Sequence, residues 1–190
     1  DQDGHELLAG IIESALHLDS LILSLLEYSR LDRPTQKAQL IDTQALLDQM
    51  VAELKSEFSA SFKLPNNLPS VWGYESQLLQ LFSHLIANGL KFVKPDIQPK
   101  IAISWEDRGD FAEFSVTDNG IGIDEKYFER IFNLFQRLHT ADEFEGVGAG
   151  LAIAKKVVEK HGGQIWLNSR VGQGTTFTFT LAKEATGLAR

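Results

Sequence analysis

The 190-residue sequence contains no cysteine, no long apolar run and no excess of basic residues. Without cysteine, disulfide bonds and thiolate metal sites are excluded, which is usual in a reducing compartment and favours a cytoplasmic location. A membrane-spanning helix needs about 20 consecutive apolar residues. The most apolar segment, residues 16–26, is interrupted by Asp19, Ser20 and Ser24. We therefore expect no membrane contact within this chain.

Acidic residues outnumber basic ones, 26 to 18, and the formal net charge is −8 at pH 7. Nucleic-acid surfaces are built from clustered lysine and arginine, so we expect no nucleic-acid partner. If the protein binds phosphate, it should do so locally, through backbone N–H groups and a metal ion rather than through a basic patch.

The first 32 residues have the pattern of a helix that packs in a bundle. Apolar residues recur at steps of three and four and stop before Pro34, since proline ends a helix. The stripe consists of Leu8, Ile11, Ala15, Leu18, Ile22 and Leu25, widened by Ile12, Leu16, Leu21 and Leu26. One helix cannot bury such a stripe alone, so the pattern predicts a homodimer formed through this helix. We assign residues 1–34 to this segment and residues 35–190 to a separate domain.

The second segment alternates between strand patterns and amphipathic helix patterns, which predicts one α+β domain. The predicted strands cover residues 38–43, 62–64, 101–105, 111–116, 164–167 and 175–181, with a further short strand that ends at Trp72. The predicted helices carry residues 46–54, 78–90 and 151–160. The last helix ends at His161, which, like His17, we expect at the surface.

Residues 84–92 place polar side chains on one face of a helix. The four-residue spacing aligns His84 with Asn88, and Lys91 lies beside them. An amide oxygen such as that of Asn88 is a suitable Mg²⁺ ligand, because Mg²⁺ prefers oxygen donors and shares its shell with substrate phosphates. The same pattern also fits a helix with an ordinary polar face toward solvent.

Three glycine-containing segments follow. In residues 118–123 (Asp-Asn-Gly-Ile-Gly-Ile), the glycines would let the backbone approach a flat ligand, and Asp118 can accept from an exocyclic amine. Residues 146–151 (Gly-Val-Gly-Ala-Gly-Leu) open a helix, whose free N–H groups can bind phosphate. Residues 172–176 (Gly-Gln-Gly-Thr-Thr) would alone be a hairpin turn. Taken singly, the first segment also fits a turn and the second is weak evidence.

Two phenylalanines, Phe132 and Phe135, precede a polar stretch at residues 140–145. This pattern indicates a hinged lid anchored by its aromatic side chains, with Arg137 and His139 able to face phosphate. Plain core packing of the phenylalanine pair is the alternative.

Together, these five segments resemble the N, G1, F, G2 and G3 boxes of the histidine kinases, a branch of the GHKL ATPase superfamily. The resemblance runs from about residue 38 to residue 182. Residues 1–32, which end in Leu-Glu-Tyr-Ser-Arg-Leu, resemble the second helix of the family's dimerisation and phosphoacceptor module. The resemblance implies a Bergerat-type α/β sandwich, a mixed sheet with helices on one face, that binds ATP. It also implies transfer of the γ-phosphoryl group to a histidine and onward to a response regulator receiver domain.

The resemblance also implies roles for individual residues. Asn88 would ligate the Mg²⁺ that bridges the phosphates, Lys91 would pair with phosphate, and Arg137 would reach in from the lid. His84 departs from the family, and because neutral imidazole prefers softer metals than Mg²⁺, we expect it to donate to phosphate rather than bind the ion. The adenine would be bound by Phe92, Asp118, Gly120, Gly122, Ile123 and Thr176. Backbone N–H groups would be presented to the phosphates by Gly146, Gly148, Gly150 and Leu151.

The sequence departs from the family at several positions. His84 stands where asparagine is usual, and Gly89 stands where alanine is usual, which weakens the helix by about 1 kcal/mol. Val147 and Ala149 replace the commoner threonine and a bulkier aliphatic residue. None of these changes removes a backbone donor, so we expect ATP binding to persist with altered affinity or lid motion.

The phosphoacceptor motif does not match. His5 is followed by Glu6 but then by Leu-Leu-Ala-Gly, and it lies where the second helix should begin. We therefore expect the acceptor histidine to be missing from this chain, which should bind ATP without phosphorylating itself. Two alternatives stay open: another GHKL member, such as an anti-sigma serine kinase or a gyrase-like ATPase, and a degenerate domain that docks a partner without turnover. A gyrase-like ATPase would require a glutamate base at position 84.

Overall fold

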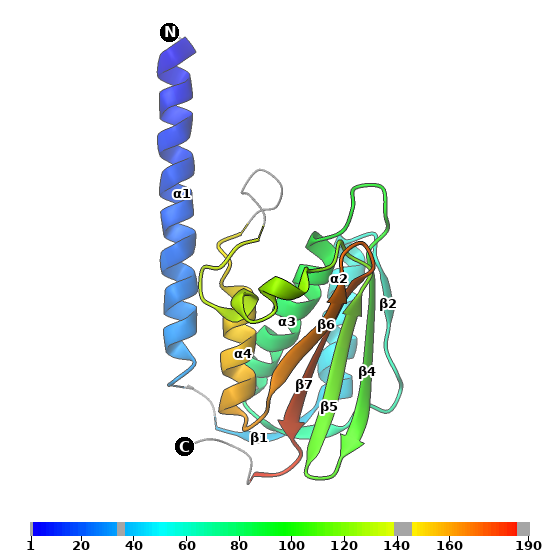
Figure 1. The fold of residues 1–190 in the computed structure, drawn as a ribbon. Helices are drawn as coiled ribbons and strands as arrows, with labels where there is room; N and C mark the ends of the chain where they lie inside the picture. Colours follow the sequence, from blue (N-terminus) through cyan, green and yellow to red (C-terminus); the bar gives the residue numbers. More distant parts are fainter. Residues whose placement is uncertain (1, 34–36, 139–145, 186–190) are drawn as a thin grey trace.

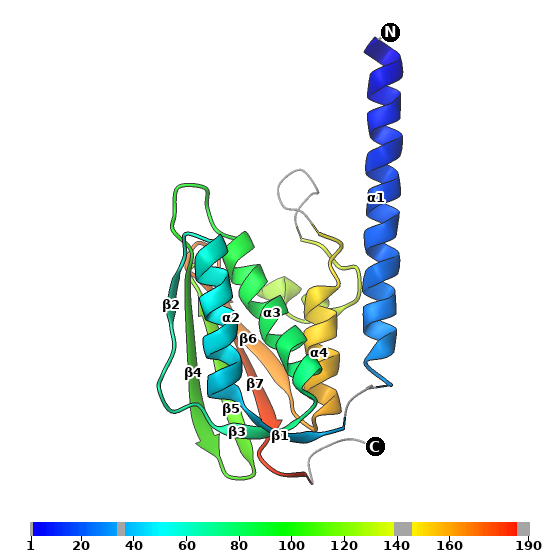
Figure 2. The same ribbon diagram turned by 180° about the vertical axis from the view of Figure 1, so that it is seen from behind.

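The computed structural model describes residues 2–33, 37–138 and 146–185. A long helix, α1 (Gln2–Arg30), precedes a domain in which helices cover one face of a sheet (Figure 1). The N-terminal half of α1 projects beyond that domain in both side views (Figures 1 and 2). None of the described helices combines the length and the apolar character that a bilayer crossing would require.

The described part of the domain contains two sheets and three α-helices. The strands are β1 (Gln39–Asp42), β2 (Ser61–Lys63), β3 (Ser70–Gly73), β4 (Lys100–Arg108), β5 (Phe111–Asp118), β6 (Ile165–Arg170) and β7 (Gly174–Ala182). The helices are α2 (Thr43–Glu57), α3 (Glu75–Lys91) and α4 (Gly150–Lys160), with the 3₁₀ turns η1 (Glu125–Tyr127) and η2 (Arg130–Phe132). The larger sheet has the order β2-β4-β5-β7-β6, and β1 pairs with β3 in a separate ribbon.

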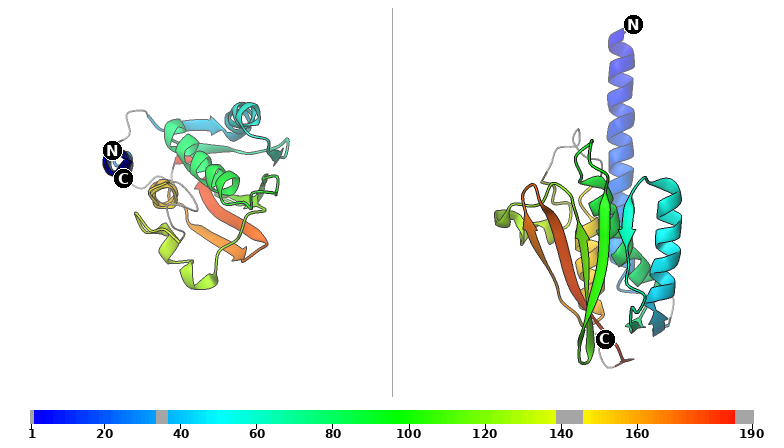
Figure 3. Two further views of the ribbon diagram at one scale, coloured as in Figure 1. Left: turned by 90° about the horizontal axis from the view of Figure 1, so that it is seen from above. Right: turned by 90° about the vertical axis from the view of Figure 1, so that its right-hand side faces the viewer.

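The larger sheet is mixed and has one covered face. β2 runs parallel to β4, whereas the other neighbours are antiparallel. Along β5, Ala112, Phe114 and Val116 are buried, and the residues between them point the other way, as the twofold repeat of a strand requires. The helices α2, α3 and α4 lie on the buried side (Figures 2 and 3). This arrangement confirms the predicted α/β sandwich.

Three phenylalanines form the centre of the core between α3 and the sheet. The Phe82 ring meets the rings of Phe114 and Phe179 edge-on, at centroid distances of 5.7 and 5.5 Å. The rings of Phe114 and Phe179 stack on adjacent strands at 5.6 Å. All three side chains are fully buried, so they fix α3 over β5 and β7.

His161, predicted at the surface, is instead fully buried at the C-terminal end of α4. Its Nδ1 lies 2.7 Å from the Val157 carbonyl oxygen, and its Nε2 accepts from the Tyr74 N–H at 3.2 Å. A Cβ on Gly73 would lie 2.5 Å from the ring, so this glycine makes room for it. The prediction was wrong because the helix end packs beneath the start of α3, a contact that local sequence does not reveal.

The apolar stripe of α1 is uncovered over most of its length. Ile11 is 66% exposed and Leu18 is 59% exposed. Only the end of the helix meets the domain, where Leu31 is buried against it and Lys156 of α4 lies 4.1 Å from the Tyr28 ring centroid. The helix itself was predicted correctly, and the chain provides no cover for its apolar face within the described residues.

Most predicted strands and helices are confirmed, with differences at their ends. The hairpin of β4 and β5 runs further than predicted, with Gly109 in its turn at φ 72°. The turns η1 and η2 were not predicted, since they lie in a segment without regular periodicity. His139 and residues 140–145, assigned to a lid, lie outside the described residues.

Candidate active site

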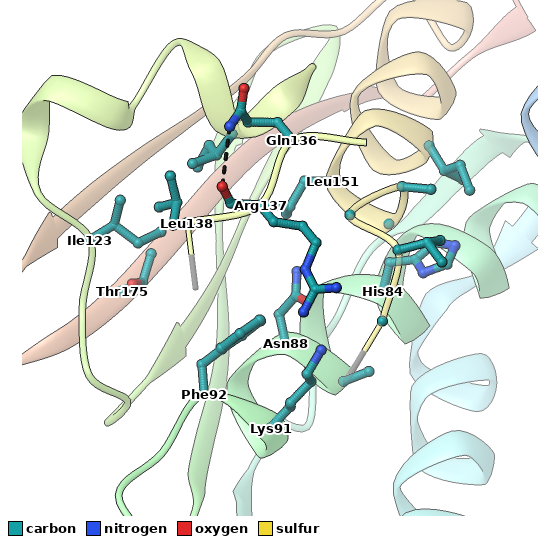
Figure 4. Close-up of a pocket in the computed structure, with 18 of the residues that line it drawn as sticks. His84, Asn88, Lys91, Phe92, Ile123, Gln136, Arg137, Leu138, Leu151 and Thr175 are labelled. Atoms are coloured by element: carbon teal, nitrogen blue, oxygen red, sulfur yellow. Dashed lines mark hydrogen bonds between the residues drawn. The ribbon is translucent and has the colours of Figure 1, made fainter. Parts of the chain in front are cut away.

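One pocket of about 350 Å³ lies between α3, α4 and the C-terminal end of β5 (Figure 4). Its size suits a small-molecule ligand. All predicted site residues line it except Gly120 and Thr176. The pocket therefore brings together His84, Asn88, Lys91, Phe92, Asp118, Gly122, Ile123, Arg137, Gly146, Gly148, Gly150 and Leu151.

Asp118 ends β5 and is held by backbone donors. Its Oδ1 accepts from the N–H of Gly120 at 2.7 Å and from the N–H of Thr175 at 3.1 Å. Burial has the larger influence and raises the pKa of Asp118 above its ordinary value, while the two N–H donors act in the opposite direction. A partly buried carboxylate with a fixed orientation is suited to accept a hydrogen bond from a ligand amine.

The glycines around Asp118 bring protein backbones together. A Cβ on Gly120 would lie 2.4 Å from the Phe92 carbonyl oxygen, and one on Gly122 would lie 2.1 Å from that of Arg170. A Cβ on Gly174 would lie 2.1 Å from the Asp118 carbonyl oxygen. The missing side chains of Gly120 and Gly122 thus let this loop pack against the end of α3 and the β6–β7 hairpin, and their approach to a flat ligand stays a prediction.

Thr175, rather than the predicted Thr176, faces the pocket. The Thr176 hydroxyl lies 3.0 Å from that of Thr117, on the other face of the sheet. Neighbouring strand residues point to opposite faces, so a displacement of one residue reverses the assignment. The Thr175 N–H, which binds Asp118, is the contact that the glycine-threonine segment contributes.

Ser169 of β6 was missed by sequence reasoning and braces this end of the pocket. Its hydroxyl accepts from the Ile123 N–H at 2.8 Å and donates to the Gly174 carbonyl oxygen at 2.8 Å. The Thr175 hydroxyl lies 2.8 Å from it. Nothing local marked this serine, because its partners come from two other segments, the loop after β5 and strand β7.

At the other end of the pocket, α3 presents polar side chains on successive turns. Figure 4 shows Asn88, Lys91 and Arg137 directed toward the same space. The Lys91 Nζ lies 4.6 Å from the Phe92 ring centroid. Since Lys91 and Arg137 enter from different segments, an anion in this space would be approached by cations from two sides.

Gly89, a departure from the family pattern, has a packing reason. It is buried on the sheet side of α3, where a Cβ would lie 2.5 Å from Ile101 Cδ1 and 2.9 Å from Asp118 Cβ. Alanine would push the helix away from β4 and β5. In this chain the glycine therefore holds α3 close to Asp118, and its helix-weakening effect is offset by this close approach.

The glycine segment before α4 is arranged to leave N–H groups accessible. Gly146 and Gly148 have φ values of 117° and 75°, which favour glycine. Ala149, at the N-cap, contributes no side-chain hydrogen bond to the first turn of α4. The first-turn N–H groups of an eleven-residue helix thus open on the pocket together with its positive dipole end.

Phe132 and Phe135, the two phenylalanines before the polar stretch, lie in different environments. The Phe132 ring packs edge-on against Phe177 of β7, at 6.5 Å between centroids. Phe135 is 40% exposed and has a positive φ of 63°, unusual for a bulky residue. Phe132 is thus an anchor in the core, and Phe135 is not.

Helix α1 also reaches the pocket, which sequence reasoning did not foresee. Ser24 and Glu27 line it, and the Glu27 Oε1 lies 3.2 Å from the His84 Nε2. His84, expected to face phosphate, is therefore engaged with α1 in this structure. The residue lies at a junction between α1, α3 and the start of α4.

Comparison with known proteins shows the family to which the pocket-forming part of the chain is similar. Residues 73–185 match the family model described as histidine kinase-, DNA gyrase B- and HSP90-like ATPase. The chain belongs to this family. The matched region covers more than half of the chain and includes α3, all three glycine-containing segments and α4.

Similar proteins show which kind of protein within this family the chain resembles. Phytochrome-like protein Cph1 of Synechocystis sp. is 46% identical over 95% of this chain and 24% of that protein. The methanogenesis regulatory histidine kinase FilI of Methanothrix harundinacea is 33% identical over 92% of this chain and 20% of that protein. Full-length ShkA, solved in complex with AMPPNP, has a TM-score of 0.71 at 25% identity and covers 97% of this chain and 40% of ShkA. The chain is thus a catalytic domain of the sensor histidine kinase type that spans a quarter or less of these curated relatives.

Proposed function

We propose that the chain is the ATP-binding catalytic part of a two-component sensor histidine kinase. It transfers the γ-phosphoryl group of ATP to a histidine on an acceptor helix, from which the group passes to a response regulator receiver domain. One observation carries this proposal: a single pocket has two chemically different ends. Asp118 lies at one end, and Asn88, Lys91, Arg137 and the glycine segment 146–150 lie at the other.

The Asp118 end suits an adenine ring. The carboxylate, fixed by Gly120 and Thr175, accepts from the exocyclic amine of the base. Phe92 and Ile123 provide apolar contacts on the same walls. A hydrogen bond to a charged group contributes about 1.5–3 kcal/mol, enough to favour adenine over a base that presents a carbonyl there.

The other end suits a polyphosphate. The N–H groups at the start of α4 bind phosphate oxygens, and Lys91 and Arg137 neutralise charge from two sides. Among the described residues, no cluster of three or more acidic or histidine side chains forms a metal site. An Mg²⁺ ion would therefore take Asn88 as its protein ligand and otherwise bind nucleotide oxygens and water, and it would supply charge neutralisation.

The chain's contribution to the reaction is positioning and electrostatics. Phosphoryl transfer requires little covalent participation by the protein, so holding the γ-phosphate in line with an acceptor imidazole provides most of the rate enhancement. Arg137 and the glycine segment flank the phosphate end, where they would limit the access of water. The acceptor histidine is proposed to lie on another helix, and the side chain of His5 is not part of the described structure.

The relatives support the partners of this function. Relatives named as histidine kinases support a response regulator as the partner, and the exposed apolar stripe of α1 supports a homodimer formed through residues 1–34. Residues 35–190 would form the catalytic domain. The cytoplasmic location stays a prediction from composition.

One observation favours the alternative of a degenerate, partner-docking domain. His84 contacts Glu27 on α1 instead of reaching into the phosphate end. If this contact persists, nucleotide affinity falls and the domain acts mainly through α1.

Calorimetric titration of ATP with Mg²⁺ into the chain distinguishes the proposed kinase domain from the degenerate domain. The proposed function predicts that the unmodified chain binds ATP and that Asp118→Asn abolishes binding, because the amide places a donor against the adenine amine. Asp110→Asn, the same change in the exposed β4–β5 turn, is the matched control and should bind like the unmodified chain. No binding by the unmodified chain would instead support the degenerate domain.

A further inference from the structure

The phosphate end of the pocket is closed in part by α1. Ser24 and Glu27 are the α1 residues that line it. The Glu27 carboxylate touches His84 Nε2 at 3.2 Å, and both side chains are partly buried. On the other side of the ring, a Cβ on Gly150 would lie only 3.0 Å from His84 Nδ1. His84 is thus held between α1 and the first residue of α4, whose N–H groups face the phosphate end.

The position of Glu27 is fixed by an anchor at the C-terminal end of α1, formed by Tyr28 and by residues 31 and 32, which follow the helix. The Lys156 Nζ donates to the Tyr28 carbonyl oxygen at 3.2 Å and to the Asp32 carboxylate at 2.8 Å. The Lys160 Nζ and the Gln77 amide both donate to the Leu31 carbonyl oxygen. These contacts satisfy carbonyl groups at the C-terminal end of α1, where cations are favoured.

This anchor does not depend on Glu27, and it keeps the carboxylate at the pocket wall. Leu31 is 2% exposed, so the end of α1 is also held by apolar packing. Moving Glu27 away from His84 therefore requires only a rotation of its side chain or a bend of α1 above the anchor. The anchor and the Glu27–His84 contact are separable.

We infer that Glu27 is part of the nucleotide site and competes with the phosphate tail for His84. This inference rests on the proposed function. A polyphosphate would attract the His84 N–H and the cations Lys91 and Arg137, and it would repel the Glu27 carboxylate across the same space. Each phosphate group added to the ligand increases this repulsion.

The consequence is a coupling between nucleotide binding and the Glu27–His84 contact that joins α1 to the pocket. Binding of ATP weakens the Glu27–His84 contact, and by linkage that contact weakens ATP binding by the same factor. The ligand most affected is the nucleoside triphosphate, and a monophosphate is affected least. The state of the pocket is thereby reported to α1, the helix that carries the exposed apolar stripe.

The test compares affinities for ATP, ADP and AMP, with Mg²⁺ present, between the unmodified chain and Glu27→Gln. We expect Glu27→Gln to bind ATP about fivefold more tightly, with a smaller gain for ADP and the smallest for AMP. Asp19→Asn makes the same charge change on α1, about 12 Å from Glu27 at the helical rise of 1.5 Å per residue, and should leave all three affinities unchanged. In a His84→Asn background, Glu27→Gln should lose most of its effect, because the two residues act as a pair.

Each contrary result has a definite meaning. An unchanged ATP affinity in Glu27→Gln, or an equal gain in Asp19→Asn, overturns the inference and leaves the proposed function intact. A gain of equal size for all three nucleotides overturns it as well, because it would not depend on the phosphates. If the unmodified chain binds none of the three, the proposed function fails and the inference fails with it.

Discussion

Helices α1 and α3 have similar amphipathic patterns and very different environments. On α3, Leu78, Leu81 and Leu85 are buried within the domain. On α1, Leu8 and Leu18 are each 59% exposed. The periodicity that predicts a helix and its apolar face does not say what covers that face. For α3 the cover comes from this chain, and for α1 we propose that it comes from a second copy.

The largest expected effect concerns the covered helix. Phe82→Ala should lower the free energy of unfolding by about 3–5 kcal/mol, because it leaves a cavity between Phe114 and Phe179. Chemical denaturation measures the change. The counterpart on α1, Leu18→Ala, should leave the stability of the catalytic domain nearly unchanged. Equal losses for the two would contradict the view that α1 lacks an apolar cover within the chain.

The next effect concerns the uncovered helix. Leu18→Glu should convert a dimer into a monomer, because it places a charge in the proposed interface twice, and burial of each leucine contributes about 1.5–3 kcal/mol. Sedimentation measures the oligomeric state. Ser20→Glu adds the same charge beside the stripe and should remain dimeric. If the unmodified chain is a monomer, the proposal of a dimer formed through α1 is wrong.

A smaller effect is expected at the base end of the pocket. Ser169→Ala removes the partner of the Ile123 N–H and of the Gly174 carbonyl, so ATP affinity should fall about tenfold, equivalent to ~1.4 kcal/mol. Ser104→Ala, on the exposed face of β4, is the control. The measurement is calorimetric, and an unaltered affinity in Ser169→Ala would show that the brace has no role in binding.

The smallest effect is a pH dependence of stability. Burial lowers the pKa of His161 below its ordinary value, opposed by the Val157 carbonyl and reinforced by the charge of Lys160. Below pH 6.5 the unfolded chain therefore binds a proton on His161 that the folded chain does not bind. The contribution of this group to the free energy of unfolding is complete above pH 6.5 and falls as the pH drops toward the pKa of the folded state. The loss is at most about 1.4 kcal/mol per pH unit.

Denaturation curves at pH 7.5 and 5.5 measure this slope. His17→Gln, a change at an exposed histidine of α1, should leave it unaltered. A slope of opposite sign, with greater stability at pH 5.5, would show that the charged imidazole is accommodated in the core.

The sequence predicted the fold class and nearly all strands and helices, and all of its candidate site residues except Gly120 and Thr176 line the pocket. It succeeded where the signal is local, as for Asn88 and Lys91 on one helix face or the glycines before α4. It was less successful where a contact with another segment determines the role of a residue. Thr175 replaces Thr176 because strand register sets the face, and Gly122 is explained by a backbone that arrives from β6.

Other features depended entirely on contacts between distant segments. His161 is buried by Tyr74, from a helix that lies far from it in the sequence. Glu27 could not be assigned to the pocket, since nothing in residues 1–32 indicates which part of the helix meets α3. At these positions packing, rather than sequence pattern, determines where the side chain lies.

The most direct test of the nucleotide site is a crystal structure of the chain with Mg²⁺ and a non-hydrolysable ATP analogue. We expect the adenine amine to donate to Asp118 and the phosphates to lie between Asn88, Lys91 and the start of α4. We also expect the Glu27–His84 contact to be broken. A nucleotide bound elsewhere, or one whose adenine does not reach Asp118, would contradict the assignment of this pocket as the ATP site.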